Sequence, residues 1–310
     1  FNNKNVGIGK TVTVNSITLS DGSNGGLASN YTISAGQTTT ANITGKALTV
    51  SGITAPNKTY DGNTNAPLDV SSISYSGLVS GDDIGGSFSG TFENKSIGTG
   101  KTVTISSSYS GVDSGNYSVT DQSSTTANIT TRALTVSGLT ASNKSYDTTT
   151  SATLNTSNVS YAGLVSGDSF SGSYTGTFND ANVGTSKLVT ISSSYSGNDI
   201  NNYSITNQSS TGADITKASP TISGLSNQAK YSDENYTLAG VPSISGLSIN
   251  YSSSDSNIAS VNSSSGAVSI LTTGVTTITA SIDATSNYNA ANATYILSIT
   301  TRPSTGGSPS

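Results

Sequence analysis

The sequence predicts an all-β protein built from tandem β-sandwich-like domains arranged as an elongated rod. Three observations support this prediction: a long internal repeat, an apolar period of two, and the lack of helical spacing. Lys46-Ala-Leu-Thr-Val-Ser-Gly52 returns 86 positions later as Arg132-Ala-Leu-Thr-Val-Ser-Gly138. A period of this length indicates modules in series, each of which closes its own core.

Short segments of the chain alternate apolar and hydroxyl side chains, as half-buried strands do. Clear examples are residues 48–50, 72–76, 102–106 and 295–299. Clusters of Gly, Asn, Asp and Ser, such as Ser80-Gly-Asp-Asp83, separate such segments and predict turns. No segment keeps an i, i+3, i+4 apolar spacing, so we expect helices to be nearly absent.

The composition distinguishes this chain from a disordered one. Hydrophobic residues make up only 32% of the chain, but charged residues make up only 9%. Disordered segments usually combine low hydrophobicity with high charge, whereas Val, Ile, Thr and Tyr recur here at regular intervals. The composition therefore predicts β domains with thin cores.

The repeats divide the chain into five predicted segments: 1–45, 46–131, 132–216, 217–301 and 302–310. The first is the carboxy-terminal half of a repeat, because Phe1-Asn-Asn-Lys-Asn-Val-Gly7 matches Phe92-Glu-Asn-Lys-Ser-Ile-Gly98. The second and third are complete repeats. The fourth opens at Lys217 and has a different interior, and the last has the composition of a flexible linker or tail.

Several classes of function are excluded or disfavoured by composition. The net charge of −5 is spread along the chain, so we expect no nucleic-acid partner. No apolar stretch is long enough for a bilayer, so we expect no membrane insertion in this segment. Cys and His are absent, which removes disulfides, thiolate metal sites and the common catalytic arrangements. The sequence therefore predicts no enzyme and no cofactor.

Methionine is also absent, so Phe1 is not a translation start. We expect the chain to be processed or to be a piece of a longer protein.

The two complete repeats resemble the YDG repeat family. The resemblance rests on Lys58-Thr-Tyr-Asp-Gly62, Gly90-Thr-Phe-Glu-Asn-Lys-Ser-Ile-Gly98, Lys101-Thr-Val-Thr-Ile105, Gly115-Asn-Tyr117 and Ala127-Asn-Ile-Thr130. Such repeats occur in very long exported bacterial proteins, including filamentous-haemagglutinin-like adhesins, which implies an extracellular or cell-surface setting. The second copy has Thr148 in place of the motif glycine. Since threonine tolerates positive φ poorly, this substitution predicts that the turn does not require it.

Residues 217–301 resemble a bacterial immunoglobulin-like domain of group 2 type. The resemblance rests on Ile249-Asn-Tyr-Ser-Ser-Ser-Asp255, Ile258-Ala-Ser-Val261, Gly266-Ala-Val268 and Gly274-Val-Thr-Thr-Ile-Thr-Ala280. It implies a β-sandwich of the kind used as a spacer in adhesins and cell-wall proteins.

The family motif supplies the first candidate residues: Tyr60, Asp61 and Gly62, with Tyr146 and Asp147 in the second copy. A Tyr–Asp pair could bind a polar ligand. We favour a structural motif in which tyrosine anchors the sandwich and aspartate accepts backbone hydrogen bonds in a turn.

Two further sites are candidates. Acidic turns at Asp82, Asp83 and Asp168 could hold Ca²⁺, which prefers several oxygen ligands, although solvated turns explain them more simply. Lys58 and Lys144 precede the Tyr–Asp motif and could form isopeptide cross-links to Asn or Asp, although a solvated lysine at a strand end is the simpler interpretation.

The sequence therefore predicts a structural stalk or fibre segment of a large bacterial surface or secreted adhesin, which spaces a distal binding region from the cell. Its partners would be neighbouring domains of the same long chain. Two alternatives stay open. The chain could be a subunit of an extracellular filament in which strands from another copy complete residues 1–45. It could also be an adhesive module whose Tyr and Asn side chains bind a glycan or another surface ligand.

Overall fold

The computed structural model describes residues 1–303 and consists almost entirely of β-strands. The helical elements in this part of the chain are three single 3₁₀ turns: η1 (Ala28–Asn30), η2 (Ser114–Asn116) and η3 (Ile200–Asn202). The prediction of an all-β chain of tandem β-sandwich domains is confirmed. No helix among the described residues is long and apolar enough to cross a membrane. Of the predicted tail at 302–310, residues 304–310 lie outside the described part of the chain.

The chain divides into two compact units. The first contains Phe1–Leu134, Ala162–Ser171 and Ser196–Thr206, and the second contains Thr135–Tyr161, Gly172–Tyr195 and the chain from Asn207 onward. The boundary between the units thus runs through the second repeat. The five segments inferred from the repeats, and their elongated arrangement, remain predictions.

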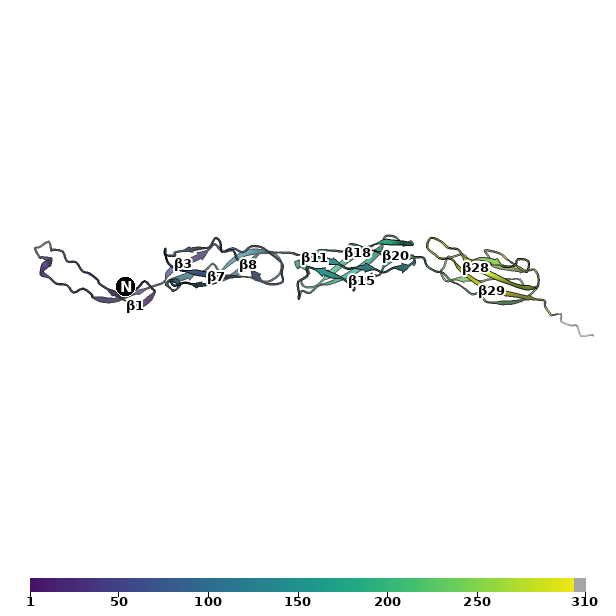
Figure 1. Cartoon of the computed structure of the whole chain (residues 1–310), viewed down its shortest axis with the longest axis horizontal. Coiled ribbons are helices and arrows are strands. Elements are labelled where there is room, and N and C mark those ends of the chain that lie inside the picture. Colours follow the sequence, from purple (N-terminus) through teal and green to yellow (C-terminus); the bar gives the residue numbers. More distant parts are fainter. Residues whose placement is uncertain (304–310) are drawn as a thin grey trace, which may run out of the picture. The chain divides into compact units, whose positions relative to one another are not determined.

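Residues 1–45 form a two-stranded antiparallel ribbon in the first unit (Figure 1). Its strands are β1 (Gly7–Thr13) and β2 (Thr38–Ile43), with a bulge between Gly7 and Lys10. Large apolar side chains on this ribbon stay exposed, including Ile8 at 91% and Leu27 at 51%. A ribbon of two strands has no second layer to cover such residues.

The first complete repeat lies wholly in the first unit. Its strands are β3 (Lys46–Ser51), β4 (Lys58–Thr59), β5 (Asn65–Ala66), β6 (Ser74–Ser76), β7 (Gly85–Phe92), β8 (Gly98–Ser110), β9 (Tyr117–Thr120) and β10 (Ser124–Thr130). One sheet has the order β4-β10-β8-β7-β5 and the other has the order β6-β3-β9. Figure 1 shows β7 and β8 running side by side in the larger sheet.

The core of this repeat follows from the alternation in its strands. In β8, Lys101, Val103 and Ile105 are buried, whereas the residues between them are exposed. Leu48 and Val50 of β3 are 0% and 2% exposed. Because the apolar residues of both sheets point inward, a thin core forms from few hydrophobic residues.

The second repeat uses the same pattern. Its strands are β11 (Arg132–Ser137), β12 (Thr140–Ala141), β13 (Lys144–Ser145), β14 (Ser151–Ala152), β15 (Leu154–Asn155), β16 (Ser160–Ala162), β17 (Ser171–Phe178), β18 (Gly184–Ser196), β19 (Tyr203–Thr206) and β20 (Ser210–Thr216). The five-stranded sheet has the order β13-β20-β18-β17-β14, which matches that of the first repeat. Thr148 has a φ of 68°, so the prediction that this turn avoids positive φ is wrong. The turn keeps its shape because the Thr149 N–H donates to the Asp147 carboxylate at 2.9 Å.

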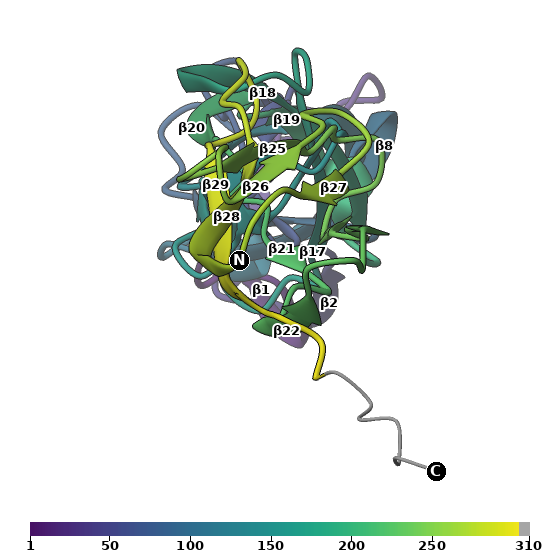
Figure 2. The same ribbon diagram turned by 90° about the vertical axis from the view of Figure 1, so that its right-hand side faces the viewer.

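Residues 217–301 form a sandwich in the second unit. The strands are β21 (Ile222–Ser223), β22 (Gln228–Tyr231), β23 (Tyr236–Thr237), β24 (Val241–Pro242), β25 (Asn250–Ser253), β26 (Ala259–Val261), β27 (Ala267–Ile270), β28 (Gly274–Ile282) and β29 (Ala291–Thr300). A sheet of order β22-β29-β28-β25 faces one of order β23-β27-β26, with Ile278 and Leu297 fully buried between them. Strands β28 and β29 (Figure 2) pair antiparallel, from Gly274 with Ile299 to Ile282 with Ala291.

Candidate functional site

The tyrosine of the family motif lies where two repeats meet. Tyr60 is 0% exposed, and its hydroxyl donates to the Asp168 carboxylate of the next repeat at 2.8 and 3.0 Å. Its ring meets that of Tyr203 edge-on, with centroids 5.6 Å apart. A role of this tyrosine as an anchor of the sandwich stays a prediction, and the structure adds a contact of Tyr60 with the following repeat. Tyr60 therefore contacts residues of both repeats.

The motif aspartates and lysines form a separate local cluster. The Lys58 ammonium donates to Asp61 at 2.8 Å and to the side-chain oxygen of Asn63 at 3.1 Å. In the second copy, the Lys144 ammonium donates to Asp147 at 2.7 Å and to the Thr149 hydroxyl at 3.0 Å. The side-chain amide of Asn63 thus has no counterpart in the second copy, where Thr149 stands at that position. Isopeptide formation at Lys58 or Lys144 stays a prediction.

A lysine bridges two carboxylates at the junction between the first and second repeats. The Lys95 ammonium lies 3.0 Å from Asp168 and 2.9 Å from Asp199. The side chain of Asp168 is 2% exposed, and it also accepts a hydrogen bond from the Tyr203 hydroxyl at 2.5 Å. One carboxylate thus receives hydrogen bonds from three donors: Lys95, Tyr60 and Tyr203.

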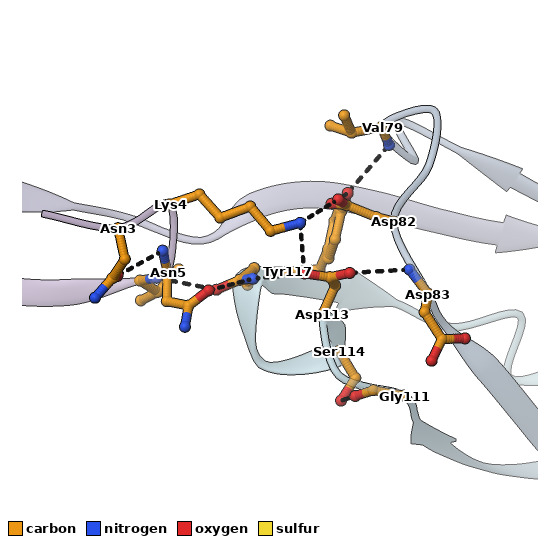
Figure 3. Close-up of polar contacts among 12 residues, drawn as sticks. Asn3, Lys4, Asn5, Val79, Asp82, Asp83, Gly111, Asp113, Ser114 and Tyr117 are labelled. Carbon is orange, nitrogen blue, oxygen red and sulfur yellow. Dashed lines mark hydrogen bonds and ion pairs between the residues drawn. The ribbon is translucent and has the colours of Figure 1, made fainter. Parts of the chain in front are cut away.

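The same arrangement occurs at the junction between the half repeat and the first repeat (Figure 3). The Lys4 ammonium lies 2.8 Å from both Asp82 and Asp113, and the Tyr117 hydroxyl donates to Asp82 at 2.5 Å. Lys4, Asp82, Asp113 and Tyr117 correspond in the repeat to Lys95, Asp168, Asp199 and Tyr203. We call each set of lysine, two aspartates and tyrosine a junction clamp.

The clamps decide the pKa values of their carboxyl groups. Hydrogen bonds from Lys4 hold the pKa values of Asp82 and Asp113 below the usual range. Burial alone would raise the pKa of Asp168, but the hydrogen bonds from Tyr203, Lys95 and Tyr60 hold it low. Burial and the hydrogen bond to Asp168 raise the pKa of Tyr203 to about 12. Each clamp is thus an ion pair with a neutral phenol at neutral pH.

Two of the three calcium candidates, Asp82 and Asp168, are parts of these clamps. Asp82 binds the ammonium of Lys4, and Asp168 binds that of Lys95. Each ammonium also binds the second aspartate of its clamp. Asp83 is exposed, and its N–H donates to the Asp113 carboxylate at 3.0 Å. Within residues 1–303 no group of three or more acidic side chains could hold a metal ion. Calcium binding remains a prediction, and the ammonium already supplies the positive charge that these carboxylates require.

The third junction, between the second repeat and residues 217–301, lacks the clamp. Ala181 stands where Lys4 and Lys95 stand in the other units, and Ala284 stands at the position of Asp113 and Asp199. The lysine and one of the two aspartates of the clamp are therefore both replaced by alanine. The tyrosine pair remains, because the rings of Tyr146 and Tyr288 meet edge-on with centroids 5.3 Å apart.

An asparagine recurs at all three junctions. Asn116, Asn202 and Asn287 each accept a hydrogen bond from a backbone N–H of the preceding repeat or half repeat, at 2.9, 3.1 and 3.1 Å. Each asparagine directly precedes the junction tyrosine. The repeated Asn-Tyr dipeptide was a sequence signal for these contacts, but only the structure shows that the partners belong to the preceding repeat.

The YDG domain matches residues 44–127 and 130–212, which together cover more than half of the chain. The two matched ranges contain both acid pairs and both motif tyrosines. No curated protein sequence matches the chain.

Solved structures resemble the chain only distantly. A Drosophila N-cadherin fragment, EC1-3, is 9% identical, with 80% of this chain and 98% of that one covered and a TM-score of 0.25. A SusE-like surface-located polysaccharide-binding protein from Bacteroides thetaiotaomicron is 10% identical, with 62% and 37% covered and a TM-score of 0.21. A fragment of intimin, in complex with the intimin-binding domain of its receptor, is 15% identical, with 51% and 62% covered and a TM-score of 0.21. These TM-scores are too low to bear on function.

Proposed function

Because the chain belongs to the YDG domain family, we propose that it is a spacer segment of an exported surface protein, in which junction clamps hold consecutive repeats in a defined arrangement. The main support for this proposal is that the same clamp occurs at two successive junctions. Its four side chains match, and they make the same contacts. Contacts that stabilised only one local turn would have no reason to recur between consecutive repeats.

The chemistry of the clamp suits a static role. An ammonium between two carboxylates, with a phenol hydroxyl on one of them, satisfies charges and hydrogen bonds without leaving a reactive group free. The chain has no His or Cys, so its acid–base and nucleophilic chemistry would depend on carboxylates, phenols and lysines. In the clamps these groups are paired with one another. We therefore propose a structural function and not an enzymatic one.

The dimensions of the repeats support use as a spacer. Strand β8 has 13 residues, and a strand of that length spans roughly 43 Å. Domains of this length placed in series would extend a distal region far from its anchor. A surface position, outside the cell, would suit this use.

Small-angle X-ray scattering of the full chain tests the proposal. A compact globule of 310 residues would have a radius of gyration of about 19 Å. We expect at least about 35 Å, because domains about 43 Å long would follow one another. A value close to that of the globule would contradict the spacer function.

A further inference from the structure

Strand β8 carries a lysine on the buried face of the first repeat. Lys101 precedes Val103 and Ile105 on the core-facing side of this strand, and its side chain is only 8% exposed. The Lys101 ammonium donates to the side-chain oxygen of Asn94 at 2.8 Å and lies 3.4 Å from the carboxylate of Glu93, which is 55% exposed. A buried ammonium is costly unless an anion compensates its charge. Here the nearer partner is a neutral amide.

The same position has different partners in the other repeats. In the second repeat, Lys187 lies 2.7 Å from the Asp180 carboxylate, which takes the place of Asn94. The hydrogen bond from Lys187 holds the pKa of Asp180 below its usual range, so this pair is a salt bridge at neutral pH. In the half repeat, the Lys10 ammonium donates to the side-chain oxygen of Asn3, so the amide is kept.

The carboxylate beside the pair is particular to the first repeat. Asn2 and Asn179 stand at the position of Glu93 in the half repeat and in the second repeat. The first repeat is therefore the one of the three that combines a lysine, an amide and a carboxylate at this position. The other two serve as natural controls, one with the amide alone and one with an ion pair.

The hydrogen bond between Lys101 and Asn94 also holds two reactive atoms close together. Because Oδ1 lies about 1.2 Å from Cγ in an amide, an Nζ atom 2.8 Å from Oδ1 is at most about 4.0 Å from Cγ. The backbone fixes both ends of this contact: Lys101 pairs with Ala127 of β10, and the Glu93 N–H donates to the Thr102 carbonyl at 3.4 Å. Fixed neighbours of this kind react far faster than free ones.

We propose that Lys101 and Asn94 form an intramolecular isopeptide bond with the help of Glu93. The Glu93 carboxylate takes a proton from the Lys101 ammonium, and the free amine attacks Cγ of Asn94. The bond from Nζ to Cγ forms, and the bond from Cγ to Nδ2 breaks. Nζ loses two protons in all, and Glu93 carries them to the departing nitrogen, which leaves as ammonium. No oxidant or other reactant is needed.

The product is better suited to its surroundings than the starting pair. The positive charge moves from a buried side chain into water with the ammonium, and a neutral amide stays behind. Glu93 is exposed enough to exchange protons with water while it contacts Nζ. Asp180 lacks this chemistry because an ionised carboxylate resists attack by an amine. In the half repeat, Asn2 cannot carry the protons.

The bond would close a loop that presents two contacts of the second junction. Residues 94–101 include Lys95 of the junction clamp and Ile97, whose N–H donates to Asn202 at 3.1 Å. A covalent link across this loop restricts the unfolded chain more than the folded one, and so stabilises the folded loop. The inference does not depend on the spacer function.

Tryptic digestion and mass spectrometry of the full chain detect the bond. Trypsin cleaves after Lys95 and after a free Lys101, so an unlinked chain yields the peptides 59–95, 96–101 and 102–132. We expect peptide 59–95 joined to peptide 96–132, with a mass about 17 Da below the sum of the two because one ammonia is lost. Recovery of the three separate peptides without the joined one would overturn the proposal.

Matched variants test the role of each group. In samples taken at intervals after cell-free synthesis, Glu93→Gln should form the link at least roughly a hundredfold more slowly, because its side chain no longer carries protons. Asn94→Ala and Lys101→Arg should abolish the link. A linked product from either of these two, or an unchanged rate in Glu93→Gln, would contradict the assigned chemistry.

The second repeat allows a gain of the bond to be tested. The paired substitution Asn179→Glu and Asp180→Asn reproduces the three groups of the first repeat, so it should add a link at Lys187 and remove about another 17 Da. Absence of this link from a variant with an unchanged circular dichroism spectrum would show that the three groups are not sufficient. A link at Lys10 or Lys187 in the unaltered chain would show that they are not necessary.

Discussion

At the scale of single residues, the two junction clamps have the same contacts but different exposure. The side chain of Lys95 is 38% exposed and that of Lys4 is 64% exposed, while their aspartate partners Asp168 and Asp82 are 2% and 13% exposed. An ion pair stabilises most when water screens it least. The second clamp should therefore contribute more to the stability of its junction than the first.

Replacing each lysine by alanine measures this difference. Lys95→Ala leaves the nearly buried Asp168 without its ammonium and should destabilise the junction by about 1 kcal/mol, well below a fully buried pair because Lys95 is partly exposed. The Ile97 amide, which donates to Asn202 across the junction, should then exchange hydrogen faster. Lys4→Ala is the control and should raise exchange at the Val6 amide by less. Equal effects of the two variants would contradict the ranking.

The turn of the second motif makes a prediction about pH. The Lys144 ammonium and then the Thr149 N–H hold the pKa of Asp147 at about 2. Because the folded pKa lies below the unfolded value of about 3.9, the stabilisation is complete above that value and is lost as pH falls towards 2. A carboxyl-carbon NMR titration should give the low pKa. Lys144→Ala should move the pKa of Asp147 towards 3.9, and an unchanged value would refute the assignment.

At the scale of single elements, glycines in the turns differ in what surrounds them. Gly52 follows β3 with a φ of 83°, and a Cβ there would be 2.2 Å from the Ser72 carbonyl oxygen. Gly81 has a φ of 92°, but no atom lies within 4 Å of its Cβ position. Of these two glycines, Gly52 is required both by its conformation and by close backbone packing, and Gly81 by its conformation alone.

Alanine substitutions should separate these two requirements. Gly81→Ala should destabilise the repeat by about 1 kcal/mol, because of positive φ alone. Gly52→Ala should destabilise it by at least about twice as much, since strand β3 must also move away from Ser72. Denaturant titrations of both variants measure the difference. A smaller effect at Gly52 would mean that the backbone relaxes without penalty.

The same strand occurs in a complete and in an incomplete setting. Strand β2 of the half repeat and strand β10 of the first repeat have equivalent sequences, but β10 has neighbours on both sides and β2 has one. Val103, the neighbour of β10 in the core, is 0% exposed, whereas its counterpart Val12 is partly exposed. Local opening should be easier where fewer contacts cover the strand.

Hydrogen exchange of the amides in Thr38–Ile43 and Ser124–Thr130 tests this expectation. We expect amide hydrogen exchange in β2 to be faster than in β10 by at least roughly tenfold. Opening β2 exposes less apolar surface to water than opening β10 does, so it costs less free energy. Because the two strands share most of their sequence, intrinsic exchange rates are a built-in control. Equal protection would show that the ribbon is stable without its second layer.

At the scale of the whole molecule, the repeats and their strands could be predicted from the sequence, because burial alternates residue by residue along each strand. The turn glycines were also visible. The junction clamps were not predicted, since Lys4 and Asp82 are 78 residues apart and neither alternation nor turn chemistry relates them. One signal was available. The second repeat has Ala181 in place of the lysine, and the domain that follows it has Ala284 in place of the aspartate at Asp113 and Asp199.

In each clamp, the lysine of one repeat pairs with the two aspartates of the next repeat. This pairing affects which repeats can be duplicated without leaving carboxylates unpaired. A gene duplication that copies residues 46–131 places Lys95 before another Asp82–Asp113 pair, so every new boundary remains charge-matched. A copy of residues 132–216 instead places Ala181 before Asp168 and Asp199, and leaves two neighbouring carboxylates without a cation. A junction formed after a copied first repeat would therefore keep the lysine of the clamp, whereas one formed after a copied second repeat would lack it.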